Sequence, residues 1–223
     1  MSTPDPPFTP ESVKRHYTEL AGTYATKENR ACKDAYRRNL LKRLGHATRL
    51  LEIGAGVSTA TAHFPAPFRV ACDLSQSMLR AAPREDVRYC AADGTRLPFA
   101  DASFDAVMSV NVLEHTPQAA LLIAEAGRVL VPGGDCVFIT PNGDCEWLLN
   151  MLEGLRLKLP EGPHRFLSSN ELRSLLSPNL QVIEHRKFLA LPLGPAAFVN
   201  AVDTIFSMGS GRGLFQLLHA KRV

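Results

Sequence analysis

The run Leu51-Glu52-Ile53-Gly54-Ala55-Gly56 constrains the fold of this chain more than any other feature of its sequence. The apolar stretch over residues 49–53 predicts a buried strand. The two glycines that follow let the chain turn sharply and approach a ligand closely. A strand that ends in a G-x-G turn is typical of the first unit of a ligand-binding α/β sheet.

The rest of the chain continues to alternate between strands and helices. Further strands are predicted over 68–72, 87–90, 104–109 and 135–140, with helices over 58–64, 75–82 and 117–130 between them. This alternation predicts an α/β fold, with a parallel sheet and helices on both faces. A helical stretch over 11–45, interrupted near Gly22, precedes the first strand. After residue 141 the pattern predicts helices over 147–159, 169–176 and 195–208, and strands over 180–188 and 214–220.

The composition argues against several classes of protein. A formal net charge of +3 is too small for the clustered basic face of a nucleic-acid-binding protein. Five basic side chains recur at helical spacing, and we interpret them as a solvated helix face: Lys33, Arg37, Arg38, Lys42 and Arg43. The five cysteines form no C-x-x-C pair and no Cys/His metal pattern, so we expect reduced thiols, no bound metal and a cytoplasmic location. No apolar run approaches the ~20 residues that span a bilayer.

An acidic residue, Glu52, stands directly before the glycine turn. The dinucleotide-binding fingerprint needs a third glycine three residues after the second, where this chain has Thr59. A carboxylate at Glu52 would also repel a pyrophosphate at the start of the following helix. The same carboxylate favours a cationic ligand. S-adenosylmethionine (SAM) carries a sulfonium and an ammonium group and no phosphate, so the turn fits SAM better than NAD.

Carboxylates also follow the next two predicted strands. Asp73 ends the strand over 68–72, where a carboxylate can accept both ribose hydroxyls of an adenosine, whether in NAD or in SAM. Asp93, followed by Gly94, comes after the strand over 87–90 and can accept the exocyclic amine of adenine. Apolar Met78 and Leu97 can lie against the two faces of that ring.

In this order the motifs of residues 49–142 resemble those of class I SAM-dependent methyltransferases of the small, ubiquinone-biosynthesis-like type. The matching runs are 51–56, Asp73-Leu74-Ser75 with Met78-Leu79, Asp93-Gly94 with Leu97-Pro98-Phe99, Ser103-Phe104-Asp105, Val112-Leu113-Glu114-His115 and Arg128 to Gly134. The resemblance implies a Rossmann-like sheet of seven strands, mostly parallel with an antiparallel last strand, and an N-terminal helical lid. It also implies the residues that hold SAM: Glu52, Gly54, Ala55, Gly56, Asp73, Leu74, Met78, Asp93, Gly94 and the backbone at Asn111.

By this resemblance the chain is one methyltransferase domain over residues 1–223. Residues 1–45 form the lid, 46–142 the SAM-binding core, and 143–223 the acceptor site and the C-terminal strands. In the lid, Tyr17 and Tyr24 resemble aromatic residues that stack on the sulfonium or close the acceptor pocket. Packing of both rings at the interface of an amphipathic helix is an equally good interpretation.

Methyl transfer is an in-line displacement, for which the protein supplies binding and alignment. A hydroxyl or amine acceptor must also lose a proton, and histidine is the natural base near neutral pH. Among the seven histidines, His115 and His164 lie where the fold points toward the ligand, so both are candidate catalytic residues. Packing against the cofactor loop explains His115 more simply than catalysis does. His164 is the better catalytic candidate of the two, and an exposed loop position is its alternative explanation.

We expect the acceptor to be a small hydrophobic or aromatic molecule, methylated on oxygen slightly more readily than on nitrogen, because the segment 144–213 is rich in Leu, Phe, Pro and Met. Two alternatives stay open: a protein or peptide methyltransferase, and a catalytically silent protein that binds SAM or a partner. A run of four apolar residues can line a homodimer interface or cover an apolar acceptor: Val199, Val202, Ile205 and Phe206.

Overall fold

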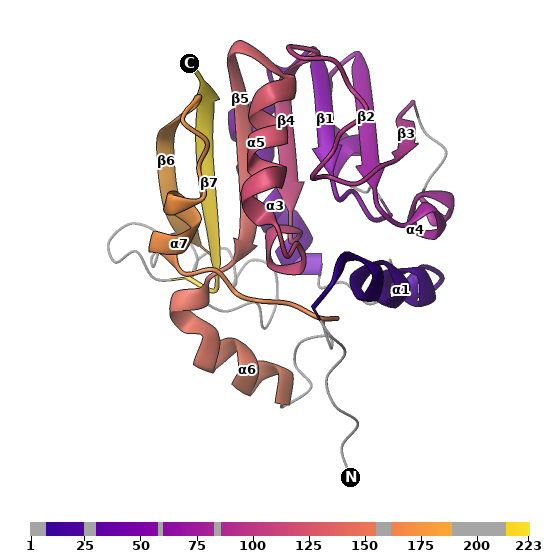
Figure 1. Cartoon of the computed structure of the whole chain (residues 1–223), viewed down its shortest axis with the longest axis vertical. Helices are drawn as coiled ribbons and strands as arrows, with labels where there is room; N and C mark the ends of the chain where they lie inside the picture. The colour runs from indigo at the N-terminus through magenta and orange to yellow at the C-terminus, as the bar shows by residue number, and fades with distance from the viewer. Residues whose placement is uncertain (1–7, 25–29, 58–59, 83–85, 155–161, 189–212) are drawn as a thin grey trace.

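The computed structural model describes residues 8–24, 30–57, 60–82, 86–154, 162–188 and 213–223. In this part the chain forms a seven-stranded sheet in the order β3-β2-β1-β4-β5-β7-β6. The strands are β1 (Arg49–Ile53), β2 (Phe68–Asp73), β3 (Arg88–Ala91), β4 (Phe104–Val110), β5 (Leu130–Pro141), β6 (Leu180–Phe188) and β7 (Phe215–Arg222). Figure 1 shows α5 in front of this sheet and α3 behind it.

β7 is the strand that runs against the others. β1 pairs in parallel with β2 and β4, β2 pairs in parallel with β3, and β4 pairs in parallel with β5. β7 is antiparallel to both of its neighbours, β5 and β6, so β6 points in the same direction as β5. The prediction of a mostly parallel sheet with an antiparallel last strand is therefore confirmed.

Helices cover both faces of the sheet and the carboxyl ends of its strands. They are α1 (Pro10–Leu20), α3 (Arg30–Leu44), α4 (Gln76–Ala81), α5 (Ala119–Val129), α6 (Glu146–Gly154) and α7 (Ser169–Ser174), with 3-10 turns η1 (Thr61–His63), η2 (Leu113–His115) and η3 (Gly143–Cys145). Ser75 caps α4 by accepting a hydrogen bond from the Met78 amide, and Ser168 caps α7 in a capping box with Glu171. Among the described helices, none is long and apolar enough to cross a membrane.

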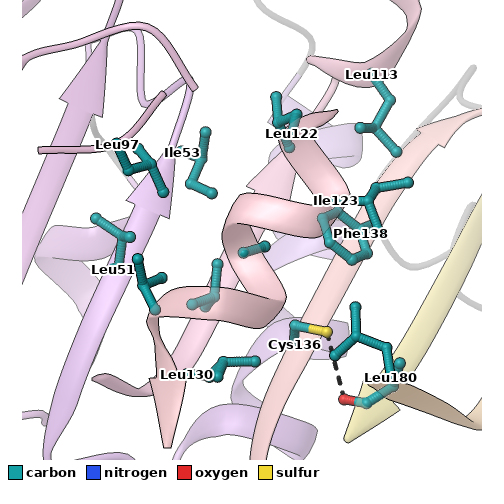
Figure 2. Packing of buried hydrophobic residues seen from close by; sticks show 14 of the residues in the cluster. Leu51, Ile53, Leu97, Leu113, Leu122, Ile123, Leu130, Cys136, Phe138 and Leu180 are labelled. Atoms are coloured by element: carbon teal, nitrogen blue, oxygen red, sulfur yellow. Dashed lines mark hydrogen bonds between the residues drawn. The ribbon is translucent and has the colours of Figure 1, made fainter. Parts of the chain in front are cut away.

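Alternating side chains along the strands build two apolar cores, one on each face of the sheet. Leu51 and Ile53 of β1 belong to the core under α5, where Leu122 lies close to them (Figure 2). Leu50 points the opposite way and joins the core under α3, together with Leu40. Burial of both faces is typical of a parallel sheet. It leaves the carboxyl ends of the strands as the place where a ligand site can form.

The start of β5 differs from the prediction. The sequence predicts that the preceding helix ends at Pro132-Gly133-Gly134 and that the strand begins at Asp135. Instead α5 ends at Val129 and β5 begins at Leu130. The added residues are accommodated because the pairing of β5 with β4 shifts register there, and because Gly133 adopts a left-handed φ of 76°.

One predicted helix is replaced by a shorter element: where the sequence predicts a helix over 58–64, the described residues form the 3-10 turn η1. The helix predicted over 147–159 corresponds to α6 as far as Gly154, and its residues 155–159 lie outside the described residues. The predicted helix over 195–208, with Val199, Val202, Ile205 and Phe206, lies outside the described residues.

Candidate functional site

A cavity of about 420 Å³ lies at the carboxyl ends of β1, β2 and β4. The loops that follow these strands line it, together with the loop after β3 and residues of α1 and α3. In Figure 1, α1 lies beyond the arrow tips of β1 and β2. The cavity therefore occupies the edge of the sheet at which open α/β folds bind their ligands.

The glycine turn after β1 forms part of the cavity wall. Gly54 and Gly56 have left-handed φ angles of 70° and 52°, which glycine adopts without strain. The amide of Ala55 donates a hydrogen bond to the Cys72 carbonyl (2.8 Å) and ties the turn to β2. A Cβ at Gly54 would lie 2.2 Å from Val112 Cγ2, so this position has no room for a side chain.

Glu52 is a buried carboxylate on the cavity wall, with 4% of its surface exposed. Its Oε2 accepts hydrogen bonds from the amide (3.2 Å) and the hydroxyl of Thr61. Because Thr61 begins η1, these bonds fix the segment that follows the glycine turn. A buried negative charge at this point attracts a cationic group and repels a phosphate.

Two backbone amides hold the carboxylate of Asp73. Oδ2 accepts a hydrogen bond from the amide of Gly56 (2.8 Å), and Oδ1 accepts one from the amide of Ser75 (2.8 Å). Burial raises the pKa of Asp73, and the hydrogen bonds from Ser75 and Gly56 oppose that rise. Each carboxylate oxygen has further acceptor capacity, so Asp73 can still accept hydroxyl groups in the cavity.

The loop after β3 supplies another wall of the cavity. Oδ1 of Asp93 accepts hydrogen bonds from the amide and from the hydroxyl of Thr95, both at 2.8 Å. A Cβ at Gly94 would lie 2.8 Å from Ile53 Cγ2 and 3.0 Å from Leu122 Cδ1. Gly94 therefore allows this loop to pack directly on β1 and α5.

Met78 and Leu97, the two apolar residues expected to flank the adenine ring, lie in different surroundings. Met78 and its neighbour Leu74 both line the cavity, and Met78 is otherwise buried. Leu97 is buried in the core under α5 beside Ile53, as Figure 2 shows, and does not line the described cavity. Leu122 of α5 lines the cavity in its place.

Asn111 follows β4 and carries two unusual features. Its φ of 53° is left-handed, which is uncommon for residues other than glycine and tolerated by asparagine. Its backbone amide donates to the Ile139 carbonyl (2.8 Å), and its Nδ2 donates to Tyr36 Oη at 3.4 Å. Its Oδ1 is buried without a hydrogen-bond partner. Backbone strain and a buried unpaired acceptor in a cavity are typical of a functional position.

One face of α1 covers the cavity. Four of its residues, spaced as one helical stripe, line it: Pro10, Val13, Lys14 and Tyr17. The Thr18 and Ser75 hydroxyls lie 2.9 Å apart and join α1 to the cap of α4. Tyr24, which also lines the cavity, meets the Tyr17 ring edge-on, with centroids 5.9 Å apart.

His115 is buried, with 6% exposure, and lines the same cavity. Its Nε2 lies 2.9 Å from Tyr17 Oη, and its Nδ1 lies 3.1 Å from the carbonyl oxygen of Pro163. The carbonyl of the neighbouring Glu114 accepts the amide of Arg165 (2.8 Å), which ties the two loops together. The structure thus brings one predicted catalytic histidine into contact with one predicted lid tyrosine.

His164, the other predicted catalytic histidine, lies behind His115. The two rings have centroids 5.9 Å apart, and the ring of His164 packs at 4.5 Å on that of Phe166. Its Nδ1 lies 2.8 Å from the Gly162 carbonyl oxygen. His164 does not line the cavity in the part of the chain that the structure describes.

Two members of the predicted solvated basic face line the cavity instead. Lys33 and Arg37 of α3 contribute to its wall, as do Asp34 and Tyr36. Arg37 Nη2 forms an ion pair with Asp34 Oδ1 at 3.1 Å. The sequence does contain a signal that this helix face is not wholly solvated, because Lys33 and Arg37 share it with the aromatic residue Tyr36.

A third member of that predicted face is buried. The guanidinium of Arg43 forms an ion pair with Glu184 of β6 at 2.7 Å and keeps 4% exposure of its side chain. Its Nη1 also donates to the Asn39 carbonyl (2.8 Å). Of the five basic residues, Arg38 and Lys42 are the exposed ones, so the interpretation of a wholly solvated face is wrong.

Comparison with known sequences finds similar proteins that share these motifs. Residues 51–138 match the family model described as a methyltransferase domain. The chain is 33% identical over 135 residues to the demethylmenaquinone methyltransferase of Mycobacterium sp. (strain KMS), in an alignment that covers 56% of this chain and 59% of that relative. The chain thus spans less than two thirds of the length of the first curated relatives that it matches.

Solved structures share the fold over nearly the whole chain. A SAM-dependent methyltransferase of Thermotoga maritima, described as a possible histamine N-methyltransferase, gives a TM-score of 0.69 at 19% identity and covers 96% of this chain and 99% of its own. The [4+2]-cyclase SpnF gives a TM-score of 0.69 at 15% identity and covers 98% of this chain and 97% of its own. At these identities the likeness is one of fold.

Proposed function

We propose that this chain transfers the methyl group of SAM to a small-molecule acceptor, because residues 51–138 match the model of a methyltransferase domain and resemble class I SAM-dependent methyltransferases. Oxygen is slightly favoured over nitrogen as the accepting atom. One observation carries the proposal: a single cavity brings together Glu52 of β1, Asp73 at the end of β2, Asp93 after β3, and the hydrogen-bonded pair Tyr17 and His115. A methyl donor and a proton acceptor can thus act on the same bound molecule.

The residues of the cavity fit SAM. The turn at Gly54 is a cradle that a Cβ would fill, Glu52 attracts a cation, and Asn111 Oδ1 is a buried acceptor in need of a donor. When bound, SAM supplies an electrophilic methyl group and a sulfur that leaves as a neutral thioether. We propose that the residues implied by the resemblance hold it: Glu52, Gly54, Ala55, Gly56, Asp73, Leu74, Met78, Asp93, Gly94 and Asn111, with Tyr17 and Tyr24 closing over it.

The basic residues of α3 extend this fit. SAM carries a carboxylate at its methionine end, and Lys33 and Arg37 place positive charge on the cavity wall. Asp34 balances one of these charges through its ion pair with Arg37. Positive charge on this wall complements the carboxylate of the methionine moiety.

We propose His115 as the base that receives the acceptor proton, because it lines the cavity and its Nε2 faces a hydroxyl. His164 is the second candidate. Its ring packs against that of His115, which supports a role in holding the His115 imidazole in place. Both roles concern the rate of methyl transfer, so kinetic assays of the corresponding variants test them.

The proposed acceptor is hydrophobic or aromatic. Val110, Val112 and Tyr36 line the same cavity as the SAM motifs. The curated relatives are named for demethylmenaquinone, which supports this choice of chemistry without fixing the acceptor here. We further propose a cytoplasmic protein, a possible homodimer, and one domain with a lid over 1–45, a SAM-binding core over 46–142 and an acceptor part over 143–223.

Calorimetric titration with SAM and with S-adenosylhomocysteine tests the cofactor site first. We expect micromolar binding by the wild-type protein and loss of binding in Asp73→Ala, because Asp73 is held at the cavity by two amides. Asp86→Ala is the matched control, since Asp86 is exposed and away from the cavity lining. Absence of binding by the folded wild-type protein would overturn the proposal. Binding then justifies a screen of hydroxyl- and amine-bearing acceptors.

The two alternatives make different predictions in that screen. A silent SAM-binding or partner-binding protein binds SAM and methylates nothing, and the shared fold of a [4+2]-cyclase shows that this fold serves other chemistry. A protein or peptide methyltransferase transfers radiolabel from SAM to macromolecules and not to small acceptors. Transfer to a small hydroxylated ring supports the leading proposal over both.

A further inference from the structure

We propose that Tyr17 is a catalytic residue whose phenol takes the proton of the acceptor hydroxyl and passes its own proton to His115. Both residues line the cavity, and Tyr17 Oη lies 2.9 Å from His115 Nε2. This inference rests on the proposed methyl transfer. It gives the Tyr17 hydroxyl a function that stacking of its ring does not require.

The surroundings of His115 fix which ring nitrogen carries the proton. Nδ1 lies 3.1 Å from the carbonyl oxygen of Pro163, and a carbonyl oxygen only accepts hydrogen bonds. Nδ1 is therefore the protonated nitrogen of the neutral ring, and Nε2 carries the lone pair. The Tyr17 hydroxyl then donates to Nε2, so the pair is already arranged for transfer toward the histidine.

The two partners are held by different elements of the fold. Tyr17 stands on α1, where its ring meets those of His16 at 5.3 Å and Tyr24 at 5.9 Å. His115 ends η2, and the segment that supplies the Pro163 carbonyl is anchored by the bond from the Arg165 amide to the Glu114 carbonyl. The hydrogen bond thus forms only when α1 covers the cavity, which couples the relay to the closed lid.

The proton and the methyl group balance in this scheme. The acceptor O–H bond breaks as its proton moves to Tyr17 Oη, while the Tyr17 proton moves to His115 Nε2 and leaves an imidazolium. The acceptor oxygen forms a bond to the methyl carbon, and the carbon–sulfur bond breaks, so that the sulfonium becomes a neutral thioether. His115 afterwards releases one proton to solvent. No oxidant, reductant or metal is needed.

Nitrogen NMR of the full chain without any ligand tests the arrangement independently of turnover. With ¹⁵N-labelled histidine, long-range proton–nitrogen spectra distinguish a protonated nitrogen from one that carries a lone pair. We expect Nε2 of His115 to be the lone-pair nitrogen, and its resonance to move in Tyr17→Phe and to stay in place in Tyr89→Phe. Tyr89 is the matched control because it lies on β3 and does not line the cavity. A proton on Nε2 in the neutral ring would overturn the relay.

Kinetics with 1-naphthols that carry electron-withdrawing substituents then test the chemical role. We expect Tyr17→Phe to lower kcat by about 100-fold for a naphthol that is neutral at the assay pH, in the range of general base catalysis. For a naphthol that is already ionised, the loss should be less than about threefold, because no proton must be removed. Equal losses with both acceptors would show that Tyr17 acts only in packing, and overturn the proposal.

The NMR, kinetic and SAM-binding measurements together also separate failure of the relay from failure of the proposed function. SAM binding in Tyr17→Phe should stay within about threefold of wild type, because the ring is retained and only the hydroxyl is lost. If the folded wild-type protein binds no SAM while the NMR result is as expected, the methyl transfer proposal fails and the proton arrangement stands. If methyl transfer occurs and Tyr17→Phe is as fast as wild type with the neutral naphthol, the relay fails and the proposed function stands.

Discussion

Gly54 lies directly against Val112: a Cβ at position 54 would come within 2.2 Å of Val112 Cγ2. Gly54 also has a left-handed φ of 70°, which strains any side chain. We therefore expect Gly54→Ala to push the loop after β4 away from the glycine turn and to abolish measurable SAM binding. Calorimetry with SAM checks the binding, and circular dichroism checks that the variant is folded.

Gly133→Ala is the control that separates the two effects expected in Gly54→Ala, the steric clash with Val112 and the strain of a left-handed backbone. Gly133 has a φ of 76°, but no atom lies within 4 Å of the position its Cβ would take. We expect a loss of about 1–2 kcal/mol in the free energy of unfolding, from backbone strain alone, and SAM binding like that of wild type. Loss of binding in this variant as well would contradict the steric explanation.

Asp73 should make SAM affinity depend on pH. Burial raises its pKa, so the carboxyl takes up a proton at a higher pH than an ordinary aspartate, whose pKa is about 3.9. The charged form is the stronger acceptor for hydroxyl groups. Affinity should therefore be full above the raised pKa and fall as the pH drops through it. Calorimetry from neutral to acidic pH measures this fall, and Asp73→Asn should bind weakly with no such step.

Arg128 on α5 should stabilise the loop after β3. Its guanidinium donates to Glu125 Oε1 (2.7 Å) and to the carbonyl oxygens of Phe99 (2.8 Å) and Leu97 (3.1 Å). A lysine cannot reproduce this fork, so we expect Arg128→Lys to lower the free energy of unfolding by about 1–3 kcal/mol. Urea denaturation measures the loss, and Arg96→Lys, at an exposed position on the same loop, should change it little.

The same interaction has a defined pH range. The hydrogen bond from Arg128 lowers the pKa of Glu125 below that of the unfolded chain, so the carboxylate stabilises the fold above the unfolded pKa. This stabilisation is lost as the pH falls through the lowered pKa of the folded state. The stability difference between wild type and Arg128→Lys should therefore shrink in acid. A difference that is constant across that range would argue against the ion pair.

Glu184→Gln tests the ion pair that joins α3 to β6. The substitution leaves the buried guanidinium of Arg43 without a charged partner, so we expect the free energy of unfolding to fall by about 1–3 kcal/mol. Urea denaturation again gives the value. Glu146→Gln, an exposed glutamate at the start of α6, is the control for the loss of a carboxylate. Equal stability of the two variants would show that the pair contributes nothing.

The sequence predicts the cavity best where the site consists of strand ends. Glu52, Asp73 and Asp93 each lie at or near the carboxyl end of a predicted strand, and a parallel sheet brings such ends to one edge. Every residue that the resemblance assigns to SAM lines the cavity, Asn111 and Tyr24 included. Pattern and topology predicted the positions of the acidic residues, whereas Asn111 and Tyr24 came from the resemblance to the family.

The walls supplied by helices were not predictable in the same way. Periodicity shows which residues of a helix share a face, but it does not show what that face meets. The sequence therefore shows that Lys33 and Arg37 share a helix face with Tyr36, but it does not show that α3 turns this face to the cavity. For the same reason the sequence places His115 and His164 equally near the ligand, whereas the path of the chain through Pro163 leaves His164 behind His115.

The bond between Thr18 and Ser75 ties α1 to the cap of α4, next to Asp73, while Tyr17 ties the same helix to His115. One helix thus touches the cavity at two places. If bound SAM holds this helix in position, the two reactants of the proposed methyl transfer should bind in a compulsory sequence, with SAM first and the acceptor second. Inhibition by S-adenosylhomocysteine should be competitive with SAM and noncompetitive with the acceptor, which is the steady-state pattern of an ordered mechanism.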